Sequence, residues 1–394
     1  MTKTLATIAL TAAAATVTSV LRAQINPPAP SGPYAVGRRN VVWTDSTRRD
    51  PTDTTRWREI NAWVWYPAKP QERAGTEAPL PGEWETRRLQ TLETKLGPEI
   101  AGAMKEFAVH ARTNAQLLAG TSRLPVLLFT PGLSWLTTDY SVLLDDLASH
   151  GYIVVGFSPT GFSDPVMFPD GRLAKRSLGN GASIATDQDY INDDAVFVLH
   201  QIRELNSHGF LRDRIDLGRI GAFGHSIGGV VSLALAARDT AVRAAINIDG
   251  DVMGDAREIR PHQPILFLNS DAPTVAESPS DWTPKRVELT REGFERSEKR
   301  RTDEWTNTSS QSVSAHRVRI TGAQHLNFTD AALASGHTGS KQARWMKFGP
   351  IDPARGLTIT NELVRSFFDQ VFGRASVDDL FTSTERHFAE VRVE

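Results

Sequence analysis

The spacing of apolar and polar positions changes along the chain near residue 124. Before that point, residues 34–43 and 59–66 are rich in β-branched and aromatic side chains, and the second run alternates apolar with polar positions. This alternation predicts strands, and the polar stretch between the two runs predicts an antiparallel pair that starts a sheet. Residues 83–118 instead repeat apolar positions at helical spacing, which predicts a helical insertion broken at a Gly-Pro pair.

After residue 124, short apolar runs alternate with longer amphipathic stretches. Strands separated by helices predict right-handed crossovers and a mostly parallel sheet with helices on both faces. The sequence therefore predicts the α/β class. The expected strands are 125–130, 152–157, 219–223, 242–249, 263–269 and 316–321, and the expected helices are 140–150, 187–205, 230–238 and 356–372.

A glycine-rich turn lies between one of these strands and the helix that follows it. Residues 224–229 read Gly-His-Ser-Ile-Gly-Gly, so Ser226 has a glycine two positions away on each side. A serine in this pattern between a strand and a helix is typical of a nucleophile elbow. The turn is so sharp that neighbouring residues must lack side chains, and it lifts the serine hydroxyl above the sheet edge. The N–H of Ile227, at the start of the helix, can face an oxyanion beside the serine.

A serine hydroxyl becomes a good nucleophile when an imidazole takes its proton and a carboxylate orients that imidazole. In a fold of this order, the acid and then the histidine follow the serine along the chain. His325 follows the last expected strand by a short glycine-containing loop, where a general base is held over the elbow. His225 adjoins Ser226, so we expect its side chain to pack beneath the elbow instead.

Two aspartates compete for the role of the acid. Asp249 ends the strand after the elbow helix, and Asp271 ends the next strand. Both positions are used in this fold order, and aspartates after strands also commonly cap turns. Asp251 and Asp255 lie close to Asp249, but their spacing is not that of a calcium loop, so the sequence implies neither a metal nor a cofactor.

Residues 125–164, 218–251 and 264–330 resemble the platelet-activating factor acetylhydrolase family and, more distantly, secreted bacterial polyester hydrolases and lipases. The matching motifs are the elbow at 224–229, Leu-Ala-Ser-His-Gly-Tyr at 147–152, Ile-Asn-Ile-Asp at 246–249, and His-Leu-Asn-Phe-Thr-Asp at 325–330.

The resemblance implies an α/β-hydrolase fold that hydrolyses carboxylic esters, with Ser226 as nucleophile, His325 as base and Asp249 as acid. In the other hydrolase branch the acid lies at the position of Asp271, which remains the alternative. The resemblance also implies that Leu133 supplies the second oxyanion N–H, although this chain has Pro-Gly where the family usually has His-Gly. Trp135 either lines a substrate pocket or packs in the core.

The composition fits one large domain. The chain has 394 residues, of which 40% are hydrophobic and 23% charged, and its formal net charge is −2. This predicts a single α/β-hydrolase domain over residues 24–394, with insertions near 68–123 and 275–313, either of which could cover the site. A near-neutral charge gives no electrostatic reason to expect nucleic acid as a partner. The absence of cysteine excludes disulfides and thiolate catalysis.

Residues 1–23 carry one lysine followed by small and apolar residues, and end in alanine. This pattern predicts a secretory signal peptide and a secreted or periplasmic protein. The apolar stretch is too short and too rich in alanine and threonine for a firm membrane span.

The sequence therefore predicts a serine hydrolase of acetylhydrolase or lipase type that forms an acyl-enzyme on Ser226 and acts on a small-molecule or lipid ester. Two alternatives stay open. One is an amidase or peptidase that uses the same three residues, and the other is a non-catalytic binding protein on a hydrolase scaffold. The sequence does not specify the acyl chain, the alcohol or the oligomeric state.

Overall fold

The computed structural model describes residues 25, 27–70, 76–120, 122–179, 184–252, 257–271, 291–335, 348–374 and 387–394. The predicted signal peptide at 1–23, residues 275–290 of the second predicted insertion, and Asp255 lie outside this part of the chain.

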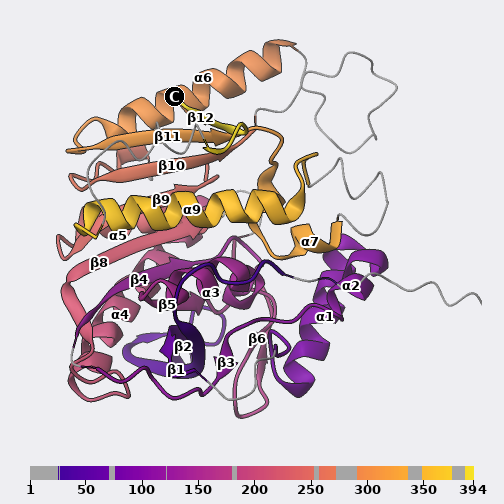
Figure 1. The fold of residues 1–394 in the computed structure, drawn as a ribbon, viewed down its shortest axis with the longest axis vertical. Helices are drawn as coiled ribbons and strands as arrows, with labels where there is room; N and C mark the ends of the chain where they lie inside the picture. Colours follow the sequence, from indigo (N-terminus) through magenta and orange to yellow (C-terminus); the bar gives the residue numbers. More distant parts are fainter. Residues whose placement is uncertain are drawn as a thin grey trace, which may run out of the picture.

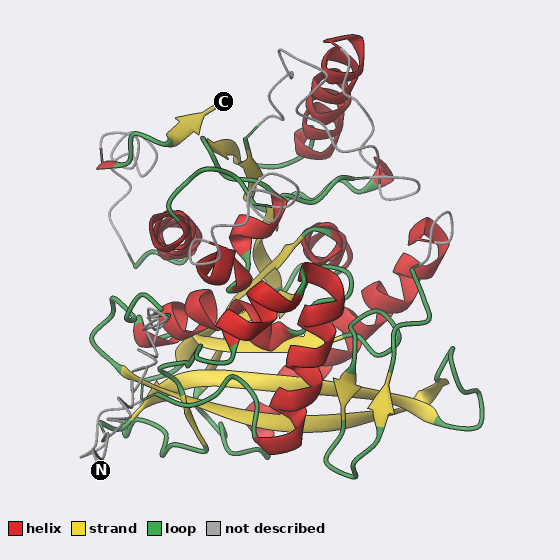
Figure 2. Ribbon diagram, turned by 90° about the vertical axis from the view of Figure 1, so that its right-hand side faces the viewer, coloured by secondary structure: helices red, strands yellow, loops and turns green. Residues whose placement is uncertain are grey.

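A ten-stranded sheet runs through the molecule (Figures 1 and 2). Its strands are β1 (Ala35–Arg49), β2 (Trp57–Ala68), β3 (Arg112–Thr113), β4 (Leu124–Thr130), β5 (Ile153–Ser158), β8 (Ile215–His225), β9 (Val242–Ile248), β10 (Ile265–Ser270), β11 (Ala315–Ile320) and β12 (Val391–Val393). The order across the sheet is β12-β11-β10-β9-β8-β4-β5-β2-β1-β3. The six strands from β11 to β5 in that order are parallel. The β1–β2 pair is antiparallel, as predicted, and β12 pairs antiparallel with β11. Outside this sheet, β6 (Val166–Met167) and β7 (Leu173–Ala174) form a short antiparallel pair.

Helices cover both faces of the sheet. Helices α3 (Ser141–Ser149) and α9 (Pro353–Val371) lie in front of it in Figure 1, and α4 (Ile184–Ser207) and α5 (Ile227–Arg238) pack on the other face. Strand β2 contributes side chains to the hydrophobic cores on both faces of the sheet. Its Trp63 and Trp65 join the core under α3 and α9, whereas the intervening Val64 joins the core under α4 and α5. The predicted mostly parallel sheet with two covered faces is confirmed.

The segment between β2 and β4 begins with α1 (Gly82–Leu96) and α2 (Pro98–Met104), which lie beyond one end of the sheet at the right of Figure 1. The prediction of helix is right up to Met104 and wrong for the residues that follow. There Phe107, Val109 and Ala111 are buried alternately with more exposed neighbours, and the backbone of Val109 exchanges hydrogen bonds with Glu77. This segment is extended, because its alternating burial and its hydrogen bonds with Glu77 are those of a strand paired with a preceding segment.

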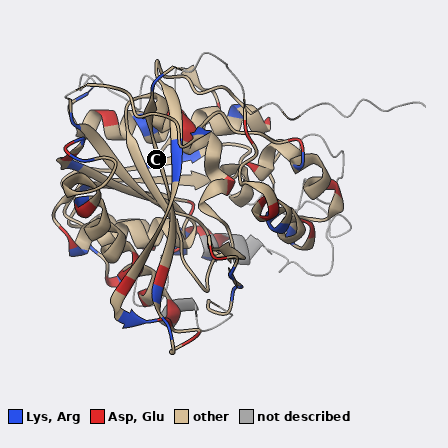
Figure 3. Cartoon of the chain, turned by 90° about the horizontal axis from the view of Figure 1, so that it is seen from below, with Lys and Arg blue, Asp and Glu red and all other residues tan. Residues whose placement is uncertain are grey.

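Helix α6 (Arg291–Ser309) lies in the second predicted insertion and packs over β10, where the rings of Trp305 and Phe267 are 5.2 Å apart. Its exposed side carries both signs of charge, as in the ion pair of Lys299 with Asp303. Seen from below, basic and acidic residues are interspersed over the molecule rather than gathered by sign (Figure 3). Across the described segments, no helix is long and apolar enough to cross a membrane.

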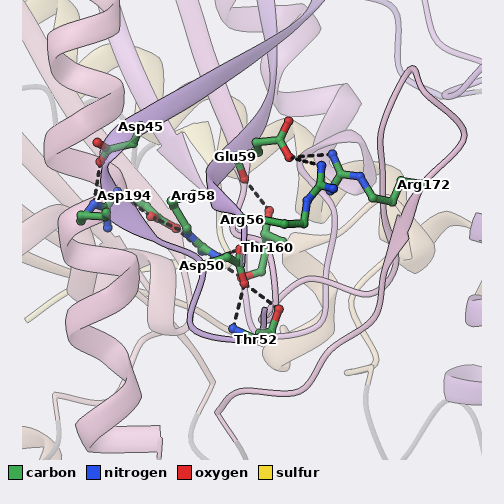
Figure 4. A network of polar contacts seen from close by, with 10 residues as sticks. Asp45, Asp50, Thr52, Arg56, Arg58, Glu59, Thr160, Arg172 and Asp194 are labelled. Carbon is green, nitrogen blue, oxygen red and sulfur yellow. Dashed lines mark hydrogen bonds and ion pairs between the residues drawn. The ribbon is translucent and has the colours of Figure 1, made fainter. Parts of the chain in front are cut away.

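A buried arginine joins the β1–β2 hairpin to the rest of the fold (Figure 4). The Arg58 guanidinium lies 2.9 Å from Asp50 Oδ2 and 3.0 Å from Asp194 Oδ1 on α4, and it donates to the carbonyl of Thr160 at 2.9 Å. The side chains of Arg58 and Asp194 are 1% and 0% exposed. Buried charges need such partners, so the cluster fixes the hairpin, the helix and the turn after β5 in one arrangement.

We expect Arg58→Leu to lower the free energy of unfolding by about 3–5 kcal/mol, because it removes the buried cation of Asp50 and leaves Asp194 with Arg48 alone. Urea denaturation followed by circular dichroism measures the change. The control is Arg56→Ala, which breaks an exposed ion pair with Glu59 and is expected to cost at most about 1 kcal/mol. Equal losses in the two variants would contradict the role given to Arg58.

Candidate active site

The elbow between β8 and α5 has the strained geometry that its sequence predicts. Ser226 has φ 57° and ψ −127°, a conformation that L-residues seldom adopt. The neighbouring glycines allow close backbone packing. A Cβ on Gly228 would lie 2.0 Å from the carbonyl oxygen of Thr130, and one on Gly224 would lie 2.3 Å from the oxygen of Gly228. The turn therefore requires glycine at both positions.

Strands β9 and β11, which both follow the elbow along the chain, bring the predicted acid and base together at their ends. His325 begins the 3-10 helix η5 (His325–Phe328) after β11, and its Nδ1 lies 2.7 Å from Asp249 Oδ2. The other carboxylate oxygen of Asp249 accepts hydrogen bonds from the N–H and the hydroxyl of Ser270, at 2.9 and 2.8 Å. Both oxygens of the carboxylate are thus held, and the carboxylate in turn fixes the orientation of the imidazole ring.

The electrostatics of Asp249 favour its ionised form. Burial alone would raise the pKa of this carboxyl, whose side chain is 3% exposed. The hydrogen bond and charge of His325, the charge of Arg301 and the bond from the Ser270 backbone outweigh burial and lower the pKa to about 2. Asp249 is consequently a carboxylate at neutral pH, ready to pair with an imidazolium on His325.

Asp271, the alternative acid, has another contact. Its Oδ2 accepts a hydrogen bond from the Gly322 N–H at 2.8 Å, and its own N–H donates to the Ala323 carbonyl at 2.8 Å. Both bonds lie in the loop that leads to His325. Asp271 therefore shapes the loop that carries the predicted base, whereas Asp249 contacts the ring itself.

The loop after β4 runs beside the elbow. A Cβ on Gly132 would lie 3.4 Å from Ser226 Cβ, so the two segments are in contact. The Gly132 carbonyl accepts a hydrogen bond from the Trp135 N–H at 3.0 Å. In a trans peptide the N–H points opposite to the carbonyl, so this bond sets the direction of the Leu133 N–H. Ile227 is the first residue of α5, where an N–H has no acceptor inside the helix.

The loop is also held from the insertion side. Trp135 is 7% exposed and packs in the core with the Lys95 ammonium 5.5 Å from its ring centre, in agreement with a packing role. Lys95, at the end of α1, also donates to the Ser134 carbonyl. Farther back on α1, the buried Arg88 lies 2.6 Å from Asp139, which follows the loop. The first insertion is thus tied to the segment that contains Leu133.

His225 packs beneath the elbow, as expected. It is 0% exposed, and its ring centre lies 4.4 Å from that of His325. Its Nδ1 lies 2.9 Å from the hydroxyl of Tyr140, a contact that the sequence analysis missed. Tyr140 stands at the start of an expected helix, and nothing in the apolar pattern distinguishes it from an ordinary core residue.

The strand order, the elbow after β8 and the histidine after β11 define an α/β-hydrolase. The family model for platelet-activating factor acetylhydrolase, isoform II, matches residues 20–158 and 200–380, which is most of the chain. The chain belongs to this family, and the predicted resemblance is confirmed.

Similar proteins include esterases. The chain is 28% identical to a probable 1-alkyl-2-acetylglycerophosphocholine esterase of Arthroderma benhamiae, over 58% of this chain and 60% of that protein. It is 20% identical to the platelet-activating factor acetylhydrolase of Gallus gallus, over 66% of this chain and 64% of that protein. The matches thus span less than two thirds of these two relatives. A ferulic acid esterase from Streptomyces cinnamoneus has a similar structure, with a TM-score of 0.68, 25% identity, and coverage of 93% of this chain and 98% of that one.

The close packing at the elbow makes a specific demand on Gly228. We expect Gly228→Ala to destabilise the protein by about 3 kcal/mol or more, because the new methyl group would meet backbone atoms that cannot move aside. The matched control is Gly356→Ala in α9, where a Cβ would meet its nearest neighbour at 3.4 Å, an ordinary contact. The control is expected to remain as stable as the wild type or to gain up to about 1 kcal/mol. Urea denaturation of both variants tests the difference, and a well-folded Gly228→Ala protein would refute it.

Proposed function

We propose that this protein is a serine hydrolase that cleaves carboxylic esters through an acyl-enzyme on Ser226. The observation that carries the proposal is the 2.7 Å contact of His325 with Asp249 beside a serine held at φ 57°. The relatives support the reaction class, because their names describe an acetyl ester of a glycerophosphocholine and an ester of ferulic acid. Both are carboxylic esters, although their acyl and alcohol parts differ.

In the proposed mechanism, the Ser226 hydroxyl attacks the acyl carbon while Nε2 of His325 takes its proton. The imidazolium then gives that proton to the departing alcohol, and the Asp249 carboxylate stabilises the transient positive charge. Water, deprotonated by His325, attacks the acyl-enzyme, and the imidazolium returns that proton to Ser226 Oγ as the bond to the acyl group breaks and the acid leaves. The N–H groups of Leu133 and Ile227 donate to the oxyanion of each tetrahedral intermediate.

The order of steps predicts acyl-enzyme chemistry that can be measured directly. We expect a p-nitrophenyl acetate burst of one equivalent per Ser226 when deacylation is slow, and labelling of Ser226 by a fluorophosphonate. Ser226→Ala is expected to lose about 10⁶-fold in kcat. Asp249→Asn is expected to lose about 10³–10⁴-fold because the imidazole loses its orienting carboxylate.

The matched control is Asp271→Asn, which keeps an oxygen for the Gly322 N–H and is expected to stay within about tenfold of the wild type. A larger loss in Asp271→Asn than in Asp249→Asn would make Asp271 the acid. A series of ester chain lengths, with an acetylated phospholipid and the matching p-nitroanilides, separates the substrate classes. Faster anilide than ester cleavage would favour an amidase, and absence of both hydrolysis and labelling would favour a binding protein.

Export is a second part of the proposal. It is supported by residues 1–23, where a lysine and an apolar run precede a small residue at a position typical of signal cleavage. In a bacterial expression host, the protein is expected in the periplasm or medium with a new N-terminus near residue 24. N-terminal sequencing measures this, and an intact Met1 on cytoplasmic protein would contradict export.

A further inference from the structure

We infer that the buried pair Tyr140 and His225 positions both the oxyanion loop and the base of the proposed esterase. The inference rests on the proposed function, because the loop and the ring need such precise placement only if Ser226 is acylated. Neither side chain supplies an atom that reacts in the proposed mechanism, so both are positioning residues. The pair is assigned from three contacts that meet beneath the elbow.

The first two contacts form a short polar chain. The Gly132 N–H donates to the Tyr140 hydroxyl oxygen at 3.1 Å, and that hydroxyl lies 2.9 Å from His225 Nδ1. Tyr140 and His225 are 1% and 0% exposed, so solvent does not compete for these bonds. The chain therefore runs from the loop after β4, through one hydroxyl, to the residue that precedes Ser226.

The direction of each bond follows from the number of protons. A backbone N–H can only donate, so the Tyr140 oxygen accepts from Gly132 and has one proton left to donate to His225. In this arrangement His225 Nδ1 is the acceptor, and the neutral ring carries its proton on Nε2. Burial, and secondly the neighbouring His325, lower the pKa of His225 well below its ordinary value, in agreement with a neutral ring.

The chain fixes the loop at its critical residue. Gly132 is held on both sides, since its N–H is bound to Tyr140 and its carbonyl accepts from the Trp135 N–H at 3.0 Å. With both flanking peptide groups fixed, the Leu133 N–H has one direction available. An oxyanion donor is effective only when it points at the developing charge before the reaction begins. Tyr140 thus contributes through Leu133.

The third contact reaches the base. The ring centres of His225 and His325 are 4.4 Å apart with a tilt of 39°, so the neutral His225 ring packs against the ring of the proposed base. When His325 becomes an imidazolium during turnover, a neutral neighbour adds no like-charge repulsion. A side chain on Gly132 would press on the His225 ring, because its Cβ would lie 3.0 Å from His225 Nδ1.

Core packing alone does not account for the Tyr140 hydroxyl. The Tyr140 ring packs edge-on against Phe129 with ring centres 4.9 Å apart. A phenylalanine would keep this ring contact. The hydroxyl is the part of the side chain that serves only the polar chain, and its removal separates positioning from packing.

The test compares Tyr140→Phe with Tyr152→Phe, since both delete a buried tyrosine hydroxyl that is hydrogen bonded. In Tyr152 the hydroxyl donates to Asp369 Oδ1 on α9 at 2.7 Å. We expect Tyr140→Phe to lower kcat for p-nitrophenyl acetate by about 10–100-fold with KM within about twofold, because the Leu133 N–H acts in the transition state. Tyr152→Phe is expected to lose stability and retain kcat.

A transition-state analogue provides a readout that a purely structural role would not change. The affinity of Tyr140→Phe for a trifluoromethyl ketone should fall by the same factor as kcat/KM, and that of Tyr152→Phe should not change. The His225 variants test the other end of the chain. Asn at position 225 can place an acceptor near that of Nδ1, so His225→Asn is expected to keep at least about tenfold more activity than His225→Leu.

The outcomes separate the inference from the proposed function. A wild type with neither hydrolysis nor Ser226 labelling overturns the proposed function and the inference with it. With an active wild type, a Tyr140→Phe variant that behaves like Tyr152→Phe overturns the inference alone. If Tyr140→Phe does not fold, equal activity of His225→Asn and His225→Leu overturns it, and the expected rescue by Asn supports it.

Discussion

The close approach of three strand ends around Ser226 is the constraint on which the rest of the site depends. The Ser226 N–H donates to the carbonyl of Ile248, at the end of β9, at 2.8 Å, and the adjacent elbow residue Gly228 packs against the carbonyl of Thr130, at the end of β4. A serine can remain in so strained a conformation only where its surroundings leave no alternative. The parallel order β4-β8-β9 provides such surroundings for Ser226, because the carboxyl ends of adjacent parallel strands share one edge of the sheet.

The same edge explains the position of Asp249, the proposed acid, directly after β9. Asp249 is the residue after that strand and has φ 51°, so the chain turns sharply there as well. The turn is closed by Asn247, whose side chain accepts from the Gly250 N–H and donates to the Gly250 carbonyl, both at 2.9 Å. A Cβ on Gly250 would lie 2.2 Å from the Ser226 carbonyl oxygen. Ser226 and Asp249 therefore occupy two turns packed backbone to backbone, which fixes their relative position.

Whether a feature could be predicted from the sequence depends on how far apart in the chain the interacting residues lie. Ser226 and His325 could be proposed from the sequence as nucleophile and base, because glycine spacing and the order of the strands can be read along the chain. The strand positions alone left Asp249 and Asp271 open, because both follow strands, and the family resemblance favoured Asp249. In the structure the His325 ring contacts Asp249, whereas Asp271 binds the Gly322 N–H in the loop between β11 and His325. Tyr140 gave no signal, since its partner His225 is 85 positions away. The prediction of helix after α2 is wrong because the extended conformation depends on pairing with an earlier segment, which the local pattern does not reveal.

The loop after β4, which carries the proposed oxyanion donor Leu133, is supported from a second direction, and this connects the candidate site to the β1–β2 hairpin. The Ser134 N–H donates to the Phe162 carbonyl at 2.9 Å, in the turn after β5. Arg58 binds the carbonyl of Thr160 in that same turn while pairing with Asp194. A buried ion pair is weak evidence for net stability, but the bonds of Arg58 to Asp50, Asp194 and the Thr160 carbonyl are all made only in one placement of its guanidinium. The loop is thus held by polar contacts of different origin, from Tyr140, from the turn that Arg58 binds and from Lys95 on α1. A site that must hold one N–H in a fixed direction benefits from all of them, because each removes a direction in which the loop could move.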